Sequence, residues 1–248
     1  MPKFNTSNDG GSEKITTSNY EFSAVRIDEL GSTEQTLVTI AVDKSGSLHG
    51  QDRNLEKMVS EAVKSCKKSD RAESIIVRVI AFDHNETEIH GFKQLNSIDP
   101  DSDYANTINT GGGTALFDAA HNAVISTAKY GEMLVDQDFA ANAIIFLITD
   151  GCDEHSTLSS ASVAKAVKDT RVGEMLDSIA IVLVGMTDGQ YATSRLNEFK
   201  NEAELDEYIE MGDVTTQKLA KLAGYVSRSV SSTSQALGTG GPSTSLSF

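Results

Sequence analysis

The sequence predicts an α/β fold, in which one doubly wound, mainly parallel sheet is flanked by helices. Four short apolar runs are spread along the chain, and segments with helical spacing lie between and after them. No Pro-rich or Ser-rich linker interrupts the alternation over about 210 residues. We therefore expect one domain rather than two.

The strands of the sheet are predicted from apolar runs that are long enough for a strand and too short for a buried helix. Four of them, residues 37–42, 75–82, 143–148 and 179–184, are almost continuously apolar, as is typical of strands buried on both faces. Three weaker candidates, residues 20–27, 87–95 and 207–211, are expected at the edges of the sheet. Gly91 is a candidate β-bulge.

Helices are predicted where apolar residues recur every three or four positions. The first stripe consists of Leu55, Met58, Val59, Ala62, Val63 and Cys66, so Cys66 is expected in the core. Two further helices are expected over about residues 115–129 and 160–176. The last helix is expected from about Thr215 to just before Gly238, with its own apolar stripe docked on the sheet: Leu219, Leu222, Ala223, Val226 and Val230.

Both ends of the chain have the composition of flexible tails. Residues 1–19 and 238–248 are rich in Ser, Thr, Asn and Gly and carry few apolar side chains. The predicted domain therefore covers residues 20–237. Leu246 and Phe248 are the exceptions in the second tail, and they leave open a small docking segment of a structural protein in a phage or other large assembly.

The charge and the cysteine content exclude several classes of function. The 21 Lys and Arg against 36 Asp and Glu give a net charge of −15, which repels phosphate backbones and anionic lipid. No nucleic-acid or membrane partner is therefore expected. Two cysteines, Cys66 and Cys152, are too few for a disulfide framework or a four-cysteine zinc site. The chain shows no signal-peptide pattern and no membrane-spanning run, so we expect it in the cytoplasm, or in a phage particle assembled there.

Oxygen-bearing side chains follow the predicted strands where a ligand crevice is expected, beyond their carboxyl ends. Asp43, Ser45 and Ser47 follow the first apolar run at alternate positions, and Thr149-Asp150-Gly151 closes the third. A glycine-rich segment ending in Thr114 opens the second helix, where glycines allow close approach of the backbone. Carboxylates and hydroxyls are ligands that Mg²⁺ prefers to sulfur and imidazole. Two carboxylates and three hydroxyls leave one position for an outside carboxylate.

These motifs resemble the von Willebrand factor A (vWA) domain over about residues 36–230. The pattern D-x-S-x-S at residues 43–47, the Gly-Gly-Gly-Thr ending at Thr114 and the Thr-Asp-Gly at residues 149–151 match the family's metal-ion-dependent adhesion site (MIDAS). The resemblance implies that Ser45 and Ser47 bind Mg²⁺ or Mn²⁺ directly. It implies that Thr114 binds directly or through water, and that Asp43 and Asp150 bind mostly through water. An acidic side chain of a partner protein completes the coordination.

The segment LAGYVSRSVSSTS, residues 222–234, is more similar to small intracellular bacterial and phage vWA proteins, such as the tellurite-resistance-associated group, than to secreted adhesins. The resemblance also implies that the last helix moves when a ligand docks in members that switch state.

Residues next to the proposed metal ligands are expected to form a rim that selects the partner: Leu48, His49, Asp83, Gly112, Gly113, Cys152, Asp153, Glu154 and His155. Three alternatives remain open for single residues. Thr114 can instead be the N-cap of the second helix, with Asp118 in its first turn. His49 and His155 can form a transition-metal site. Asp83 can support the site from behind or point to solvent. His84, His90 and His121 are expected as surface or packing residues.

The leading hypothesis is a non-enzymatic, metal-dependent protein-binding module in an intracellular bacterial or phage setting of stress response, defence or assembly. We found no nucleophile paired with a base, no phosphate-binding P-loop and no H-E-x-x-H motif. A Mg²⁺-dependent phosphohydrolase or phosphate-binding protein is the first alternative, because Asp43 ends a strand and a glycine-rich turn opens a helix. Its weakness is Ser45, where an aspartyl-phosphate mechanism requires a second acid.

Overall fold

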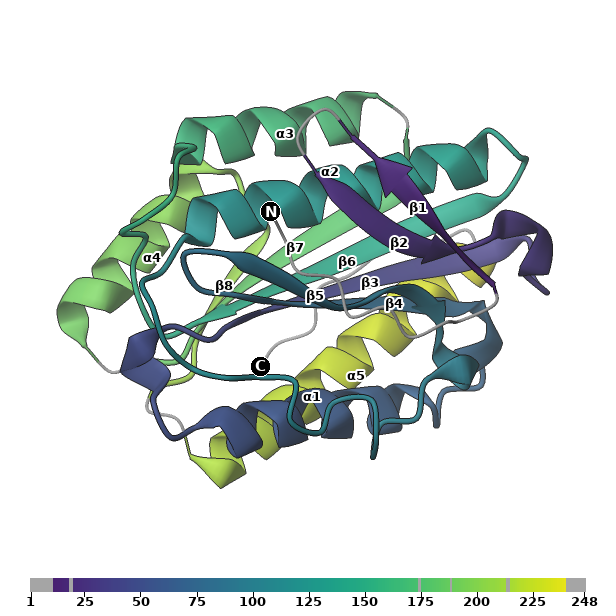
Figure 1. The fold of residues 1–248 in the computed structure, drawn as a ribbon. Coiled ribbons are helices and arrows are strands. Elements are labelled where there is room, and N and C mark those ends of the chain that lie inside the picture. The colour runs from purple at the N-terminus through teal and green to yellow at the C-terminus, as the bar shows by residue number, and fades with distance from the viewer. Residues whose placement is uncertain (1–10, 18–19, 174, 188, 213–214, 240–248) are drawn as a thin grey trace.

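The computed structural model describes residues 11–17, 20–173, 175–187, 189–212 and 215–239, and it confirms the predicted fold class. One eight-stranded sheet has the order β1-β2-β5-β4-β3-β6-β7-β8 and carries helices on both faces (Figure 1). The strands are β1 (Ser12–Thr16), β2 (Glu21–Val25), β3 (Glu34–Asp43), β4 (Ile75–Phe82), β5 (Glu86–Gln94), β6 (Ala140–Thr149), β7 (Ser178–Gly185) and β8 (Glu207–Glu210). The α-helices are α1 (Asp52–Cys66), α2 (Leu116–Val135), α3 (Ser160–Val172), α4 (Gln190–Glu202) and α5 (Thr216–Thr239).

The topology places a switch point between β3 and β6. Strands β4, β3, β6, β7 and β8 are parallel neighbours, so their carboxyl ends lie along one edge. From β3 the chain passes through α1 to β4 on one side, and it later returns through α2 to β6 on the other side of β3. In open α/β sheets, ligands bind in the crevice at such a reversal.

The helices cover both faces of the sheet. Alternate side chains of each strand point to one face or the other and pack against the helices there. Helices α1 and α5 pack on one face against Val38, Ile40 and Val42 of β3, and α2, α3 and α4 cover the other face (Figure 1). On that second face, the hydroxyls of Thr39 and Thr127 are 2.8 Å apart, which pairs two buried polar groups across β3 and α2.

The edge of the sheet differs from the prediction. Residues 20–27 and 87–95 were expected at edges, but β2 and β5 lie inside the sheet, and only β8 is an edge strand as expected. The other edge is β1, which falls within residues 1–19, assigned to the N-terminal tail by the sequence analysis. Ile15 is the only buried residue of β1, so its pattern carries little signal of a strand. Residues 1–10 and 240–248 lie outside the described part.

Gly91 marks an irregularity of β5, as predicted. The antiparallel register of β4 and β5 shifts between Val77 and Ile80, opposite the segment that contains Gly91. A Cβ on Gly91 would overlap the backbone carbonyl of Ser23 in β2. Strand β2 can therefore approach β5 this closely because residue 91 has no side chain.

Helix boundaries depart from the sequence prediction in several places. Helix α2 continues to Val135 instead of ending near residue 129, and α3 ends at Val172, before Gly173, instead of at residue 176. The backbone of α5 is helical to Thr239, two residues past the tail boundary expected before Gly238. Helix α4 was not predicted, because Leu196 and Phe199 are its only buried residues.

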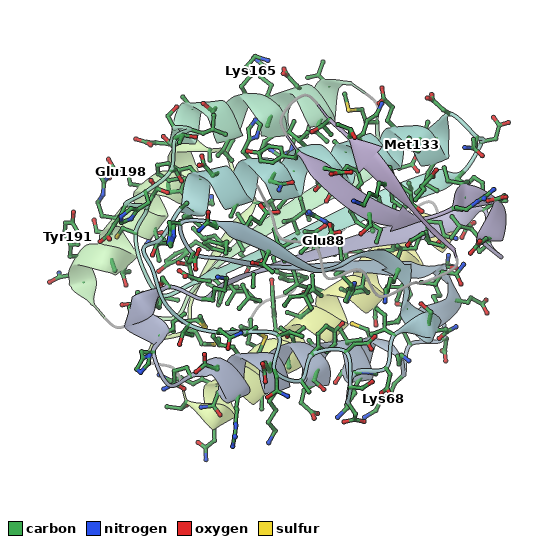
Figure 2. All side chains as sticks on the ribbon, in the orientation of Figure 1. Lys68, Glu88, Met133, Lys165, Tyr191 and Glu198 are labelled. Atoms are coloured by element: carbon green, nitrogen blue, oxygen red, sulfur yellow. The ribbon has the colours of Figure 1, made fainter. Side chains whose placement is uncertain are left out.

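A buried ionic cluster joins strands β2 and β5 to β4 and to helix α2. Arg78 of β4 is 1% exposed, and its Nε donates to Glu88 Oε2 at 3.1 Å while its Nη1 donates to Ser126 Oγ at 2.9 Å. Glu88, labelled near the centre of Figure 2, also accepts from the backbone N–H of Ser23 at 3.1 Å. Strands β2, β4 and β5 and helix α2 are thereby joined by charge-assisted hydrogen bonds.

Helices long and apolar enough to cross a bilayer are absent from the part of the chain that the structure describes.

Candidate metal centre

Three segments meet at the switch point: the loop after β3, the glycine-rich segment before α2 and the loop after β6 (Figure 1). Backbone hydrogen bonds hold the first two together, because Gly111 N–H donates to the Lys44 carbonyl at 2.8 Å and Gly46 N–H donates to the Gly112 carbonyl at 2.9 Å. The Thr114 carbonyl accepts from the N–H groups of Glu154 and His155 at 2.9 and 3.0 Å. The loops are thus fixed by their backbones, independently of the side chains they present.

The predicted ligand residues do come together here. Ser45 Oγ lies 3.1 Å from Ser47 Oγ, and Ser47 Oγ donates to Asp150 Oδ1 at 3.0 Å across 103 residues of sequence. The Thr114 hydroxyl lies 3.8 Å from the place that a Cβ would occupy on Gly151, beside Asp150. Oxygen atoms of the loops after β3 and β6 are therefore in direct contact, and Thr114 from the third segment lies beside the residue that follows Asp150.

Asp43 lies beneath these side chains and is fully buried. Its Oδ1 accepts from the Ser45 N–H at 2.7 Å, and its Oδ2 accepts from the Thr149 hydroxyl at 2.5 Å. Burial raises the pKa of Asp43 to about 6 in spite of these hydrogen bonds, and the charge of Asp150 adds to the rise. Burial also raises the pKa of Asp150. For both carboxylates, the hydrogen bonds do not offset the effect of burial on the ionised form.

The donor set fits a hard divalent cation. It consists of hydroxyl and carboxylate oxygens, and a cation between them would neutralise the two carboxylates that burial disfavours. The described residues hold no group of three or more His, Cys, Asp and Glu side chains arranged for a metal. A site that draws on two carboxylates and three hydroxyls does not require such a group, and the transition-metal site built on His49 and His155 stays a prediction from the sequence.

The N-cap alternative for Thr114 is not what the structure shows. Helix α2 has Ala115 as its N-cap residue, without a side-chain cap. Asp153 Oδ1 instead accepts from the Phe117 N–H at 3.1 Å, and Ser156 Oγ accepts from the Asp118 N–H at 3.0 Å. The Thr114 side chain is consequently not engaged in capping α2.

Part of the predicted rim is buried. Leu48 is 2% exposed and belongs to the core beneath α1, so it cannot contact a partner. Asp83 is 7% exposed, and its Oδ2 accepts from Lys44 Nζ at 2.6 Å. Asp83 therefore holds the loop after β3 in place and does not face a partner. Asp153 is engaged at the start of α2. All the other predicted rim residues, and Asp153 as well, are exposed or partly exposed: His49, Gly112, Gly113, Cys152, Glu154 and His155.

His84 belongs to this surface and was not predicted there. Its imidazole lies against Gly112, where a Cβ would overlap it, and the imidazole of His155 lies in the same way against Gly113. The two rings thus pack on successive glycines of one loop. The only sequence signal was the position of His84 directly after Asp83, at the end of a predicted strand.

No protein-family model and no curated protein sequence matches the chain. Among solved structures, the PilB minor pilin from Streptococcus sanguinis is similar, with 16% identity, a TM-score of 0.62 and coverage of 92% of this chain and 68% of the pilin. PTMP1 from the mussel byssus, solved with a zinc-occupied MIDAS motif, is 16% identical with a TM-score of 0.53, over 80% of this chain and 46% of PTMP1.

The pilus adhesin SpaC from Lactobacillus rhamnosus GG is 9% identical with a TM-score of 0.57, over 92% of this chain and 36% of SpaC. The chain thus spans about two thirds of the pilin and less than half of the other two proteins. At these identities the similarity shows the fold alone, and that fold is vWA-like.

Proposed function

We propose that the chain is a metal-dependent protein-binding module, in which a divalent cation held at the switch point takes an acidic side chain of a partner protein. The observation that carries this proposal is the continuous set of oxygens from Ser45, Ser47 and Asp150, with contacts of 3.0–3.1 Å, above the buried carboxylate of Asp43. Ser45, Ser47, Thr114 and Asp150 would hold the ion. Bound there, the ion would supply a Lewis-acidic position for an outside carboxylate.

The role of Asp43 follows from its own contacts. Asp43 is fully buried and its oxygens accept hydrogen bonds from Ser45 and from Thr149, so Asp43 supplies charge and orients the loop from beneath the other ligands. The same burial speaks against Asp43 as the nucleophile of a phosphohydrolase, which has to reach a phosphorus atom. Ser45, with its hydroxyl beside Ser47, also stands where that mechanism needs a second acid.

The similar proteins support a binding role. One is a pilin, one is an adhesin and one is a byssus matrix protein with zinc in its MIDAS motif. We propose Mg²⁺ or Mn²⁺ as the ion here, because hydroxyls and carboxylates are hard ligands. The cytoplasmic setting and the likeness to tellurite-associated vWA proteins stay predictions from the sequence.

The test is titration of the protein with Mn²⁺, followed by water-proton relaxation. We expect saturable binding that is reduced at least tenfold in Ser47→Ala and unchanged in the exposed control Ser97→Ala. Adding N-acetylglutamate methylamide should lower the relaxation enhancement as its carboxylate displaces water, and the neutral glutamine analogue should not. Equal Mn²⁺ binding by the wild type and Ser47→Ala would refute the site, and competition with Mg²⁺ and Zn²⁺ would rank the ions.

A further inference from the structure

A cavity of about 800 Å³ lies beside the proposed metal centre, between the β1–β2 hairpin, the end of β4 and the first turns of α2. Its lining includes Asp83, His84 and Ala115, which directly follows Thr114 in the sequence. The volume is within the range of ligand sites in proteins. A partner that reaches the metal therefore also lies next to this cavity.

The charged residues in the lining of the cavity are mainly acidic. Glu21, Asp83, Glu86 and Asp118 contribute to it, and His84 is the one basic residue among the described lining residues. Three of these carboxylates have cationic partners outside the lining, Glu21 with Lys14, Asp83 with Lys44 and Glu86 with Arg78. Two backbone N–H groups hold the Asp118 carboxylate, those of Thr157 and Leu158, at 3.0 and 2.9 Å. These neutral donors leave its negative charge in the wall of the cavity.

Tyr20 lies near two of these carboxylates. Its pKa is raised to about 12, first by burial and then by the negative charges of Asp118 and Glu86. The ring of Tyr20 also lines the cavity and presents an aromatic surface. Carboxylates and an aromatic ring together are the groups that receive an ammonium or guanidinium ion.

Asn122 indicates independently that a ligand could supply a hydrogen-bond donor here. The residue is 4% exposed, lines the cavity, and donates from its Nδ2 to Glu86 Oε1. Its Oδ1 is buried and has no hydrogen-bond partner among the described residues. Turning the amide over would place Oδ1 against the Glu86 carboxylate, so the present orientation is the favourable one and leaves an acceptor for a ligand.

We propose that this cavity binds the basic side chain, Arg or Lys, of the same partner whose carboxylate reaches the metal. The side chain would donate to Asn122 Oδ1 and lie between Asp118 and the ring of Tyr20. The part of this inference that concerns a shared partner rests on the proposed function, whereas the cavity itself needs no metal. The partner segment would carry an acidic residue followed or preceded closely by a basic one.

The cavity is tested first without metal. N-acetylarginine methylamide and its neutral isostere, N-acetylcitrulline methylamide, are titrated into the protein in chelator, and ¹H–¹⁵N spectra are recorded. We expect the arginine probe to shift the Asn122 side-chain amide and the Ala119 backbone amide, with a Kd at least fivefold below that of the citrulline probe. Equal affinities, or shifts confined to other parts of the protein, would overturn the proposal.

A matched pair of variants tests the location. Thr157 is exposed and lines the cavity, so Thr157→Arg places a tethered guanidinium at its mouth while Thr157→Ala does not. The Thr157 hydroxyl donates to Asp118 Oδ2 at 3.2 Å, and both variants lose this hydrogen bond. We therefore expect Thr157→Arg to bind the arginine probe at least fivefold more weakly than Thr157→Ala does. If Thr157→Arg binds the probe as Thr157→Ala does, the cavity is not the site.

The shared partner is tested with peptides in which Asp and Arg are separated by zero, one or two glycines. In Mg²⁺, at least one peptide should bind five times more tightly than its citrulline counterpart and than the arginine probe alone, and chelator should remove the gain over the probe. If the probe binds but no peptide exceeds it, the two sites do not share one segment. Failure of Mn²⁺ binding with intact probe binding refutes the metal centre and leaves the cavity standing.

Discussion

Asp43→Asn should stabilise the metal-free protein, although Asp43 is central to the proposed metal centre. Asp43 is fully buried, and burial raises its pKa from 3.8 to about 6. A carboxyl group whose pKa is higher in the folded state favours folding when protonated, so its contribution is present below about pH 3.8 and is lost as the pH rises through about 6. At pH 7 the ionised group therefore destabilises the metal-free fold.

The size of the effect follows from the two pKa values. Their difference of about 2, at roughly 1.4 kcal/mol for each pH unit, gives an upper value of about 3 kcal/mol at pH 7. Asparagine keeps the acceptor for the Ser45 N–H. The Thr149 hydroxyl can accept from the new amide and donate to the Gly151 carbonyl, which lies 3.1 Å away. We expect a gain of about 1–3 kcal/mol.

Urea unfolding at pH 7 in chelator and in saturating Mg²⁺ is the assay. In chelator, Asp43→Asn should be more stable than the wild type, and the difference should vanish toward pH 4 because the wild-type carboxyl is then protonated. Mg²⁺ at about 100 times its Kd should stabilise the wild type by about 2.7 kcal/mol and the variant by much less. The exposed control Asp70→Asn should behave like the wild type in every condition.

Two results would refute this reasoning. A variant that is less stable than the wild type in chelator would mean that the Asp43 charge is already compensated in the fold. Equal Mg²⁺ stabilisation of both proteins would mean that Asp43 contributes no charge to the metal centre.

Three further predictions concern the framework around the centre. Arg78→Met leaves the buried Glu88 without its cation, so it should lose about 3–5 kcal/mol in urea unfolding, and Arg78→Met with Glu88→Gln should recover part of the loss. Gly91→Ala would put a methyl group into the Ser23 carbonyl, so hydrogen exchange should show β2 loosened from β5, with about 1–3 kcal/mol lost. Burial raises the pKa of Glu86 to about 7, so wild-type stability relative to Glu86→Gln should fall as the pH rises from about 4.5 through 7. A pH-independent difference between those two proteins would contradict the burial of Glu86 as its cause.

The sequence predicted the central sheet because both of its faces are buried. All four apolar runs became neighbouring parallel strands, since a strand covered on both faces carries its own signal. The edge of the sheet could not be predicted in the same way. Strand β1 has one buried side chain, Ile15, and its place depends on pairing with β2 rather than on its composition.

The convergence of the candidate ligands was predictable for a related reason. Once β3 and β6 are parallel neighbours, the residues that follow them meet at one edge, as Ser47 and Asp150 do. The rim was less predictable, because exposure depends on loop geometry. Leu48 turns into the core and His84 turns onto a glycine, and neither orientation can be derived from the position of the residue in the sequence.

Affinity capture from the source cell tests the central claim most directly. Wild type and Ser47→Ala serve as bait, each in Mg²⁺ and in chelator, because Ser47 is exposed and its loss leaves the core intact. We predict a partner that is retained by the wild type in Mg²⁺ and lost in the other three conditions. A partner retained equally in all four conditions would contradict a metal-bridged interaction.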